Sequence, residues 1–177
     1  MIMRLIYQGE LEMIAPHLIF DRRDIMGGQK IQIVHLQMVK DTEIVYGRED
    51  MGNPRKAAKF VKDFLGDVDR ECLVVCATDT RLHPVYLQVA GIGAINYCPV
   101  SIPDIFKAAL LSNAADIILF HKHPAGDASP STEDILITER VMKAGGLLGI
   151  PLLDHTILGD RGHFYSFREE SSLFTSR

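Results

Sequence analysis

One stretch of the sequence limits the fold of this chain more than any other. The run DIILF at residues 116–120 leads into a loop that contains proline, glycine and serine, and a helical pattern follows at residues 131–146. A short, continuous apolar run is typical of a strand at the centre of a sheet. A strand that leads through a loop into a helix belongs to a sheet that helices cover. The stretch therefore predicts a central strand in an α/β or α+β domain.

The remaining patterns alternate between strands and helices along the chain. Asn53 is a typical first residue of a helix, and Gly66 is a typical end. A later helix is expected to end at Gly145 and Gly146. We expect helices at residues 53–66, 101–115 and 131–146, a hairpin at residues 30–39 and 42–47, and further strands at residues 71–78, 85–91, 150–159 and 164–167.

The composition narrows the class of protein. A chain of 177 residues is the size of one domain with at most a small appendage. Its net charge of −4 gives no overall basic field, so direct nucleic-acid binding is not expected, although the net charge leaves room for a local basic patch. The three cysteines, Cys72, Cys76 and Cys98, form no C-x-x-C pair, which favours a reducing cytoplasm over a disulfide framework. No apolar run is long enough for a signal peptide or a membrane span.

Two histidines stand one residue apart where the apolar run ends. In an extended segment, side chains two residues apart share a face, so His121 and His123 project together while Lys122 points the other way. Two adjacent imidazoles suit zinc, which in a catalytic site takes three protein ligands and leaves one position for water. Asp134 can supply the third ligand if the loop folds back over the strand end.

Asp134 also has a purely structural interpretation. With Ser131 it completes an S-x-x-D capping box, which stabilises a helix by about 1 kcal/mol without any metal. The two roles are compatible because a carboxylate has two oxygens. A His-x-His pair alone is weak evidence for a metal site. The ordered set of two histidines, a loop, a serine and an aspartate between a strand and a helix is stronger evidence.

The spacing of these residues resembles that of a known family. His121-x-His123, seven residues, Ser131, two residues and Asp134 match the JAMM metalloprotease motif at every position. The surrounding sequence resembles the RadC family, a bacterial branch of the JAB/MPN domains. The segments GGLLGIPLLDHTILG and FYSF carry the resemblance further along the chain, in the same order as in the family.

The resemblance runs from about Asn53 to about Glu170. It implies a deaminase-like JAB/MPN fold, an α/β three-layer sandwich with a mixed sheet flanked by helices. We expect this domain at residues 51–177, with residues 1–50 as an N-terminal hairpin extension that belongs to the same domain. The helix-hairpin-helix segment of longer RadC proteins has no counterpart in the sequence, so the chain resembles a short form.

The resemblance also implies a function and a role for each site residue. It implies a zinc-dependent hydrolase in which His121, His123 and Asp134 hold Zn²⁺ and a metal-activated water attacks a peptide or isopeptide bond. Glu71 is the expected general base, although it also fits a solvated charge at a strand start. Ser131 is the expected oxyanion donor, although it also fits a plain helix cap.

A second function stays open at this point. The chain also fits a non-catalytic zinc-binding scaffold associated with DNA repair or with a protein partner. The hydrolase needs Glu71 to face the metal ligands, and the scaffold does not. The substrate of the hydrolase would be an unidentified protein or peptide.

Two further features bear on the site. The family usually reads H-N-H-P-S-G, and here Lys122 and Ala125 replace the asparagine and the serine. Lys122 is expected to point away from the metal and to add a positive charge near it. Asp154 and His155 fit a pair that orients a metal ligand, but a buried structural histidine is the favoured interpretation of His155.

Overall fold

The protein is described by a computed structural model that covers residues 37–47, 51–93 and 100–175. Contacts between residues divide the chain into two units, Met1–Glu43 and Ile44–Arg177. The first unit is described only at residues 37–43, where every side chain is exposed and no helix or strand forms. All the described helices and strands lie in the second unit. The expected domain boundary near residue 50 stays a prediction.

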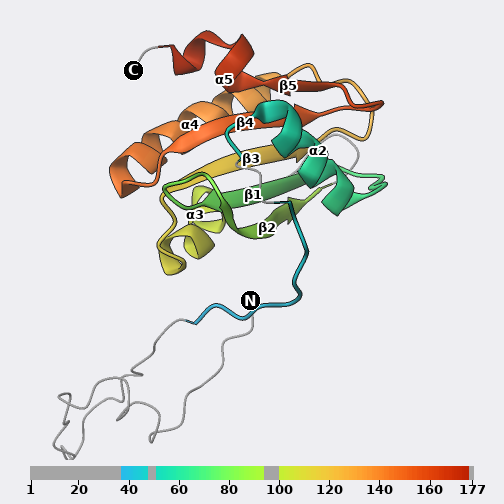
Figure 1. Cartoon of the computed structure of the whole chain (residues 1–177). Helices are drawn as coiled ribbons and strands as arrows, with labels where there is room; N and C mark the ends of the chain where they lie inside the picture. The colour runs from blue at the N-terminus through green and yellow to red at the C-terminus, as the bar shows by residue number, and fades with distance from the viewer. Residues whose placement is uncertain (1–36, 48–50, 94–99, 176–177) are drawn as a thin grey trace, which may run out of the picture. The chain divides into compact units, whose positions relative to one another are not determined.

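Five strands form one mixed sheet in the order β2-β1-β3-β4-β5 (Figure 1). Strands β3 and β4 run parallel, and the other neighbours pair antiparallel. The strands are β1 (Cys72–Thr78), β2 (Pro84–Ile92), β3 (Asp116–Lys122), β4 (Leu152–Leu158) and β5 (Phe164–Ser166). The run DIILF therefore forms the middle strand of the sheet, as predicted.

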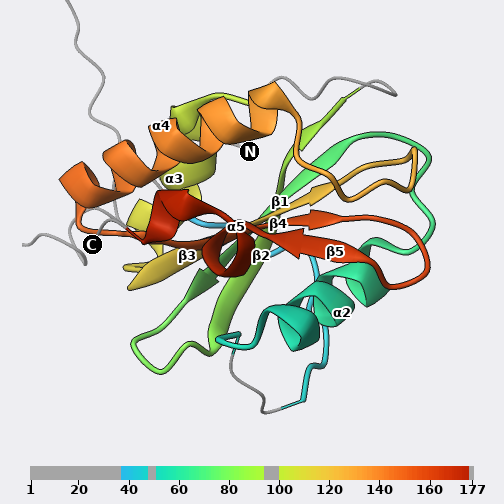
Figure 2. The same ribbon diagram turned by 90° about the horizontal axis from the view of Figure 1, so that it is seen from above.

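Helices cover both faces of this sheet (Figure 2). The helices are α2 (Pro54–Leu65), α3 (Ile102–Leu111), α4 (Thr132–Leu148) and the short α5 (Phe167–Glu170), followed by the 3₁₀ turn η1 (Ser172–Phe174). Helices α3 and α4 lie on one face, and α2 lies on the other. This is the predicted α/β architecture with three layers. No helix in the described residues is both long and apolar enough to cross a membrane.

The central strands have two buried faces, which explains their continuous apolar sequences. All seven residues of β1 are buried. Leu73 and Val75 face the core beneath α3 and α4. Val74 and Cys76 face the second core beneath α2. Alternation along the strand thus divides its side chains between two cores.

The hairpin predicted near the N-terminus is not confirmed. Residues 42–47 form no strand, and the partner at residues 30–39 lies mostly outside the described residues. Val45 is fully accessible, whereas Tyr46 is partly buried against the core beneath α2, with its ring centroid 5.9 Å from that of Phe60. An isolated hairpin gains little stability without a surface to pack against.

The predicted end of α4 at Gly145 and Gly146 is wrong. The helix continues to Leu148 and ends at Gly149, whose φ of 71° is the left-handed conformation of a helix cap. Gly145 has a different role, because a Cβ there would lie 2.5 Å from the carbonyl oxygen of Ile150. The glycine lets the returning chain pass close to the helix.

Candidate metal centre

The sheet brings two segments of the chain together where β3 ends and β1 begins. His121 lies near the end of β3, and His123 follows that strand directly. Strand β1 runs antiparallel to β3, with Cys72 opposite Lys122. Glu71, the residue before β1, therefore lies beside the end of β3, although it is 50 residues away from His121 in the sequence.

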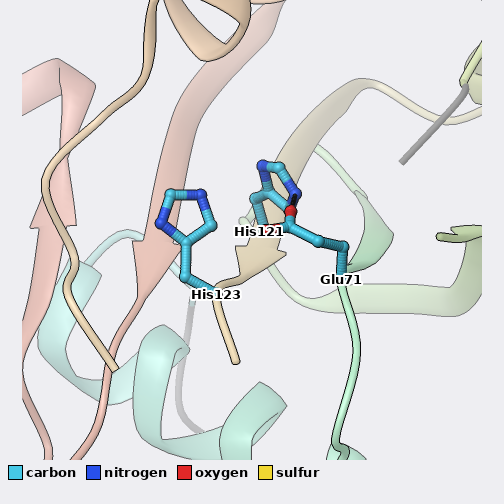
Figure 3. A group of neighbouring side chains, drawn as sticks. All are labelled: Glu71, His121 and His123. Atoms are coloured by element: carbon cyan, nitrogen blue, oxygen red, sulfur yellow. Dashed lines mark ion pairs between the residues drawn. The ribbon is translucent and has the colours of Figure 1, made fainter. Parts of the chain in front are cut away.

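Three predicted site residues meet at these strand ends (Figure 3). A carboxylate oxygen of Glu71 contacts Nε2 of His121, and the ring of His123 stands edge-on to the ring of His121 with 4.8 Å between their centroids. One possible ligand atom from each of the three residues lies within 4.8 Å of the others. The three side chains are only 11–13% exposed, so they share a nearly buried position.

The loop after His123 returns Asp134 to the same place. Asp134 lies in the first turn of α4. Its Oδ1 is 2.6 Å from Nδ1 of His121, and its Oδ2 is 3.4 Å from Nε2 of His123. Asp134 therefore contacts both histidines. Possible ligand atoms of Asp134, His121 and the buried His155 also lie within 4.8 Å of one another.

The predicted capping box of α4 is confirmed. Asp134 donates from its backbone N–H to Oγ of Ser131 at 3.1 Å. Ser131 donates to Oδ2 of Asp134 from its backbone N–H at 2.7 Å and from its hydroxyl at 2.6 Å. The hydroxyl proton of Ser131 thus points to Asp134. The oxyanion role of Ser131 stays a prediction and requires this hydroxyl to turn.

These contacts set the charges of the site. Burial raises the pKa of the Asp134 carboxyl, but hydrogen bonds with His121, His123 and Ser131 outweigh burial and hold the pKa far below its ordinary value. Burial lowers the pKa of His123, and its contacts with Asp134 and with the carbonyl of Asp127 raise it overall. Asp134 is therefore a carboxylate at neutral pH, the form that a metal ion binds.

His155 lies fully buried below the cluster and supports it from the sheet side. Its Nδ1 is 2.7 Å from Oγ1 of Thr138, and that hydroxyl donates to the backbone carbonyl of Asp134 at 2.5 Å. Burial lowers the pKa of His155 to about 3, so the ring is neutral. Thr138 is the neighbour that sequence analysis missed, and its only signal is its position one helical turn after Asp134.

Asp154 does not act with His155. Its carboxylate accepts a hydrogen bond from the hydroxyl of Ser166 at 2.6 Å and another from the backbone N–H of Arg168 at 3.0 Å. These bonds hold the start of α5. The two residues therefore do not form a pair that orients a ligand. His155 is buried, as its favoured interpretation as a structural histidine predicts, and it adjoins the cluster.

The donor atoms suit a metal ion. The cluster offers imidazole nitrogens and carboxylate oxygens, which are the ligand types that zinc binds besides thiolate. Nε2 of His121 is buried against the carboxylate of Glu71, and Nδ1 of the same ring contacts the carboxylate of Asp134. Buried charges need partners of opposite charge, and a bound cation would balance these two carboxylates. The cluster can therefore hold a metal ion.

Comparison with known proteins shows the family of this chain. Residues 51–172 match the family described as RadC-like JAB domain. The chain belongs to this family. Among relatives named UPF0758 protein, that of Shouchella clausii is 38% identical over 136 residues. Those of Thermotoga maritima and Methanosarcina acetivorans are 38% and 42% identical over 125 and 118 residues.

The matches cover most of this chain and about half of the relatives. For the three organisms in turn, the alignments cover 77%, 71% and 67% of this chain, and 58%, 55% and 51% of the relative. The chain thus spans little more than half the length of these relatives. The RadC-like JAB domain accounts for the sheet, the helices and the cluster described above.

Lys122 stands where RadC sequences usually have asparagine, and the structure shows which group its ammonium contacts. As predicted, its side chain points away from His121 and His123, into the opposite face of the sheet, where the residue is 6% exposed. Its Nζ lies 3.0 Å from Oδ1 of Asp160. The expected positive charge therefore faces a carboxylate of the β4–β5 turn, not the cluster.

Proposed function

We propose that this RadC-like JAB domain is a zinc-dependent hydrolase of the JAMM type that cleaves a peptide or isopeptide bond. In this proposal His121, His123 and Asp134 hold the zinc ion, and Glu71 is the general base. The observation that carries it is the convergence of Glu71 with both histidines in a nearly buried cluster. A general base must lie within reach of the proton that it removes.

The residues of the chain divide the chemistry among them. A bound zinc ion would polarise the carbonyl group and lower the pKa of water to about 7. Glu71 takes the proton of the attacking water and passes it to the leaving amine. Ser131, at the start of α4, donates a hydrogen bond to the developing oxyanion once its hydroxyl turns from Asp134.

The non-catalytic scaffold differs from the hydrolase in that it does not require Glu71 to lie beside the metal ligands. A non-catalytic zinc site for DNA repair or for a protein partner needs no carboxylate beside the ligands. Glu71 lies in contact with His121 and is only 11% exposed, which supports the hydrolase.

We propose a peptide or protein substrate, because the net charge of −4 disfavours nucleic acid. A reducing cytoplasm fits the free, buried thiols of Cys72 and Cys76.

Glu71→Gln tests the proposed chemistry, since it keeps the shape of the side chain and removes the base. We expect wild-type protein to cleave members of a peptide and isopeptide panel, to lose activity with a chelator and to regain it with zinc. Glu71→Gln should keep the zinc and lose activity by about 10²- to 10⁴-fold. Glu139→Gln, which changes a partly exposed carboxylate on α4 that pairs with Lys143, serves as the control and should keep full activity.

Two other results would change the proposal. Loss of zinc in Glu71→Gln would make Glu71 a ligand and would leave the base unassigned. Zinc in the wild type without cleavage of any panel member would favour the scaffold.

A further inference from the structure

The ring of His123 is oriented by the loop that follows it. Nδ1 of His123 lies 3.0 Å from the backbone carbonyl oxygen of Asp127. A carbonyl can only accept a hydrogen bond, so Nδ1 carries the proton and donates. The neutral ring then has its lone pair on Nε2, the nitrogen that faces Asp134. The shape of the His123–Asp127 turn thus selects the nitrogen that is free to bind metal.

That turn is attached to the sheet through the backbone of His123. The N–H of His123 donates to the carbonyl of Leu158 at 3.1 Å, and the N–H of Gly126 donates back to the carbonyl of His123 at 3.2 Å. Nζ of Lys122 donates to the same carbonyl at 3.2 Å. The amine of Lys122 therefore holds the backbone of the histidine from the far face of the strand.

The same amine joins the turn to its neighbour. Nζ of Lys122 binds Oδ1 of Asp160 at 3.0 Å, and the N–H of Asp160 donates to the carbonyl of Gly126 at 2.9 Å. A Cβ on Gly126 would lie 2.5 Å from Oδ2 of Asp160, so the carboxylate packs directly on the turn. Lys122 and Asp160 are thus paired with each other and both contact the His123–Asp127 turn.

We propose that Lys122 is a positioning residue for the metal centre. Through Asp160 and the carbonyl of His123 it holds the His123–Asp127 turn in the shape that presents Nε2 of His123 to the metal. A buried ammonium needs partners of opposite charge or accepting oxygens, and both partners of Lys122 belong to this arrangement. The inference rests on the proposed zinc site, whose ligands include His123.

Zinc affinity of Lys122→Met tests this inference. Methionine keeps most of the buried apolar length and removes the amine. We expect zinc to bind about 10- to 100-fold more weakly in competition with a chromophoric chelator, as on loss of other groups that orient metal ligands. The visible absorption bands of bound cobalt should also change, because they report the coordination geometry. Asp160→Asn should weaken binding in the same direction.

Lys62→Met is the matched control. Nζ of Lys62 donates to the carbonyl of Gly159 at 3.1 Å, so it ties α2 to the same β4–β5 turn without holding the carbonyl of His123. We expect wild-type zinc affinity and an unchanged cobalt spectrum in this variant. If Lys122→Met does not fold, Asp160→Asn decides, since the Asp160 side chain is 63% exposed and its change should leave the fold intact.

Three results would overturn the inference. Wild-type affinity and an unchanged cobalt spectrum in both Lys122→Met and Asp160→Asn would show that the turn needs no such support. An equal loss of affinity in Lys62→Met would assign the effect to general stability of the β4–β5 turn. A wild-type protein that binds neither metal would overturn the proposed site and this inference with it.

Discussion

At the scale of a single residue, the hydroxyl of Thr138 determines which nitrogen of His155 carries the proton. Its only proton goes to the backbone carbonyl of Asp134, 2.5 Å away. Nδ1 of His155, 2.7 Å from the same oxygen, must then donate. The lone pair of His155 is left on Nε2, which is buried without a hydrogen-bond partner among the described residues.

Removing this hydroxyl should destabilise the protein. In Thr138→Val the buried Nδ1–H of His155 loses its acceptor, which costs about 1–3 kcal/mol of unfolding free energy. Thr138→Ser keeps the hydroxyl and should lose less. Urea denaturation of the metal-free proteins measures both changes. Equal stability of the valine and serine variants would show that the proton arrangement contributes nothing.

At the scale of the element, α4 contains two adjacent glycines in different surroundings. A Cβ on Gly145 would meet the carbonyl oxygen of Ile150 at 2.5 Å, whereas a Cβ on Gly146 would have nothing within 4 Å. Alanine is better than glycine in a helix by about 1 kcal/mol. The same substitution should therefore act in opposite directions at the two positions.

We expect Gly146→Ala to raise the unfolding free energy by up to about 1 kcal/mol. Gly145→Ala should lower it, because the helix or the turn at Ile150 must move to make room. Thermal or urea denaturation of the two variants gives the comparison directly. A stabilised Gly145→Ala protein would mean that the close approach at Ile150 relaxes without cost.

The elements also show which parts of the fold a sequence can predict. Strands β1 and β3 are continuous apolar runs, and the cap residues of α2 and α4 act locally, so their positions followed from the sequence. The end of α4 did not follow from the sequence, because Gly145 is required by the close approach of the Ile150 carbonyl oxygen, which lies beyond the helix. Helix α5 was missed as well. Its N-cap is the local Ser166, which accepts from the N–H of Glu169, but the helix has only four residues. Asp154 of β4 adds a non-local hydrogen bond from the N–H of Arg168.

At the scale of the whole molecule, the same distinction separates the ligands from their supports. The proposed ligands His121, His123 and Asp134 lie within one strand–loop–helix unit, so their spacing alone was enough to predict them. Glu71 reaches them only through the pairing of β1 with β3, and the family resemblance was needed to single it out. The ion pair of Lys122 with Asp160 spans 38 residues and has no signal in the sequence.

We expect this RadC-like JAB domain to bind one metal ion where β1, β3 and α4 meet. The most direct test is the zinc content of protein purified without chelator or affinity tag, measured for the wild type and for His123→Ala. His83→Ala is the control and should keep the metal, since the His83 ring pairs with Asp79, just after the opposite end of β1 from Glu71.

We predict about one zinc ion per wild-type chain, as a single three-ligand site requires, and its loss in His123→Ala. No zinc in the wild type after zinc is added back would contradict the claim, and so would full retention of zinc in His123→Ala.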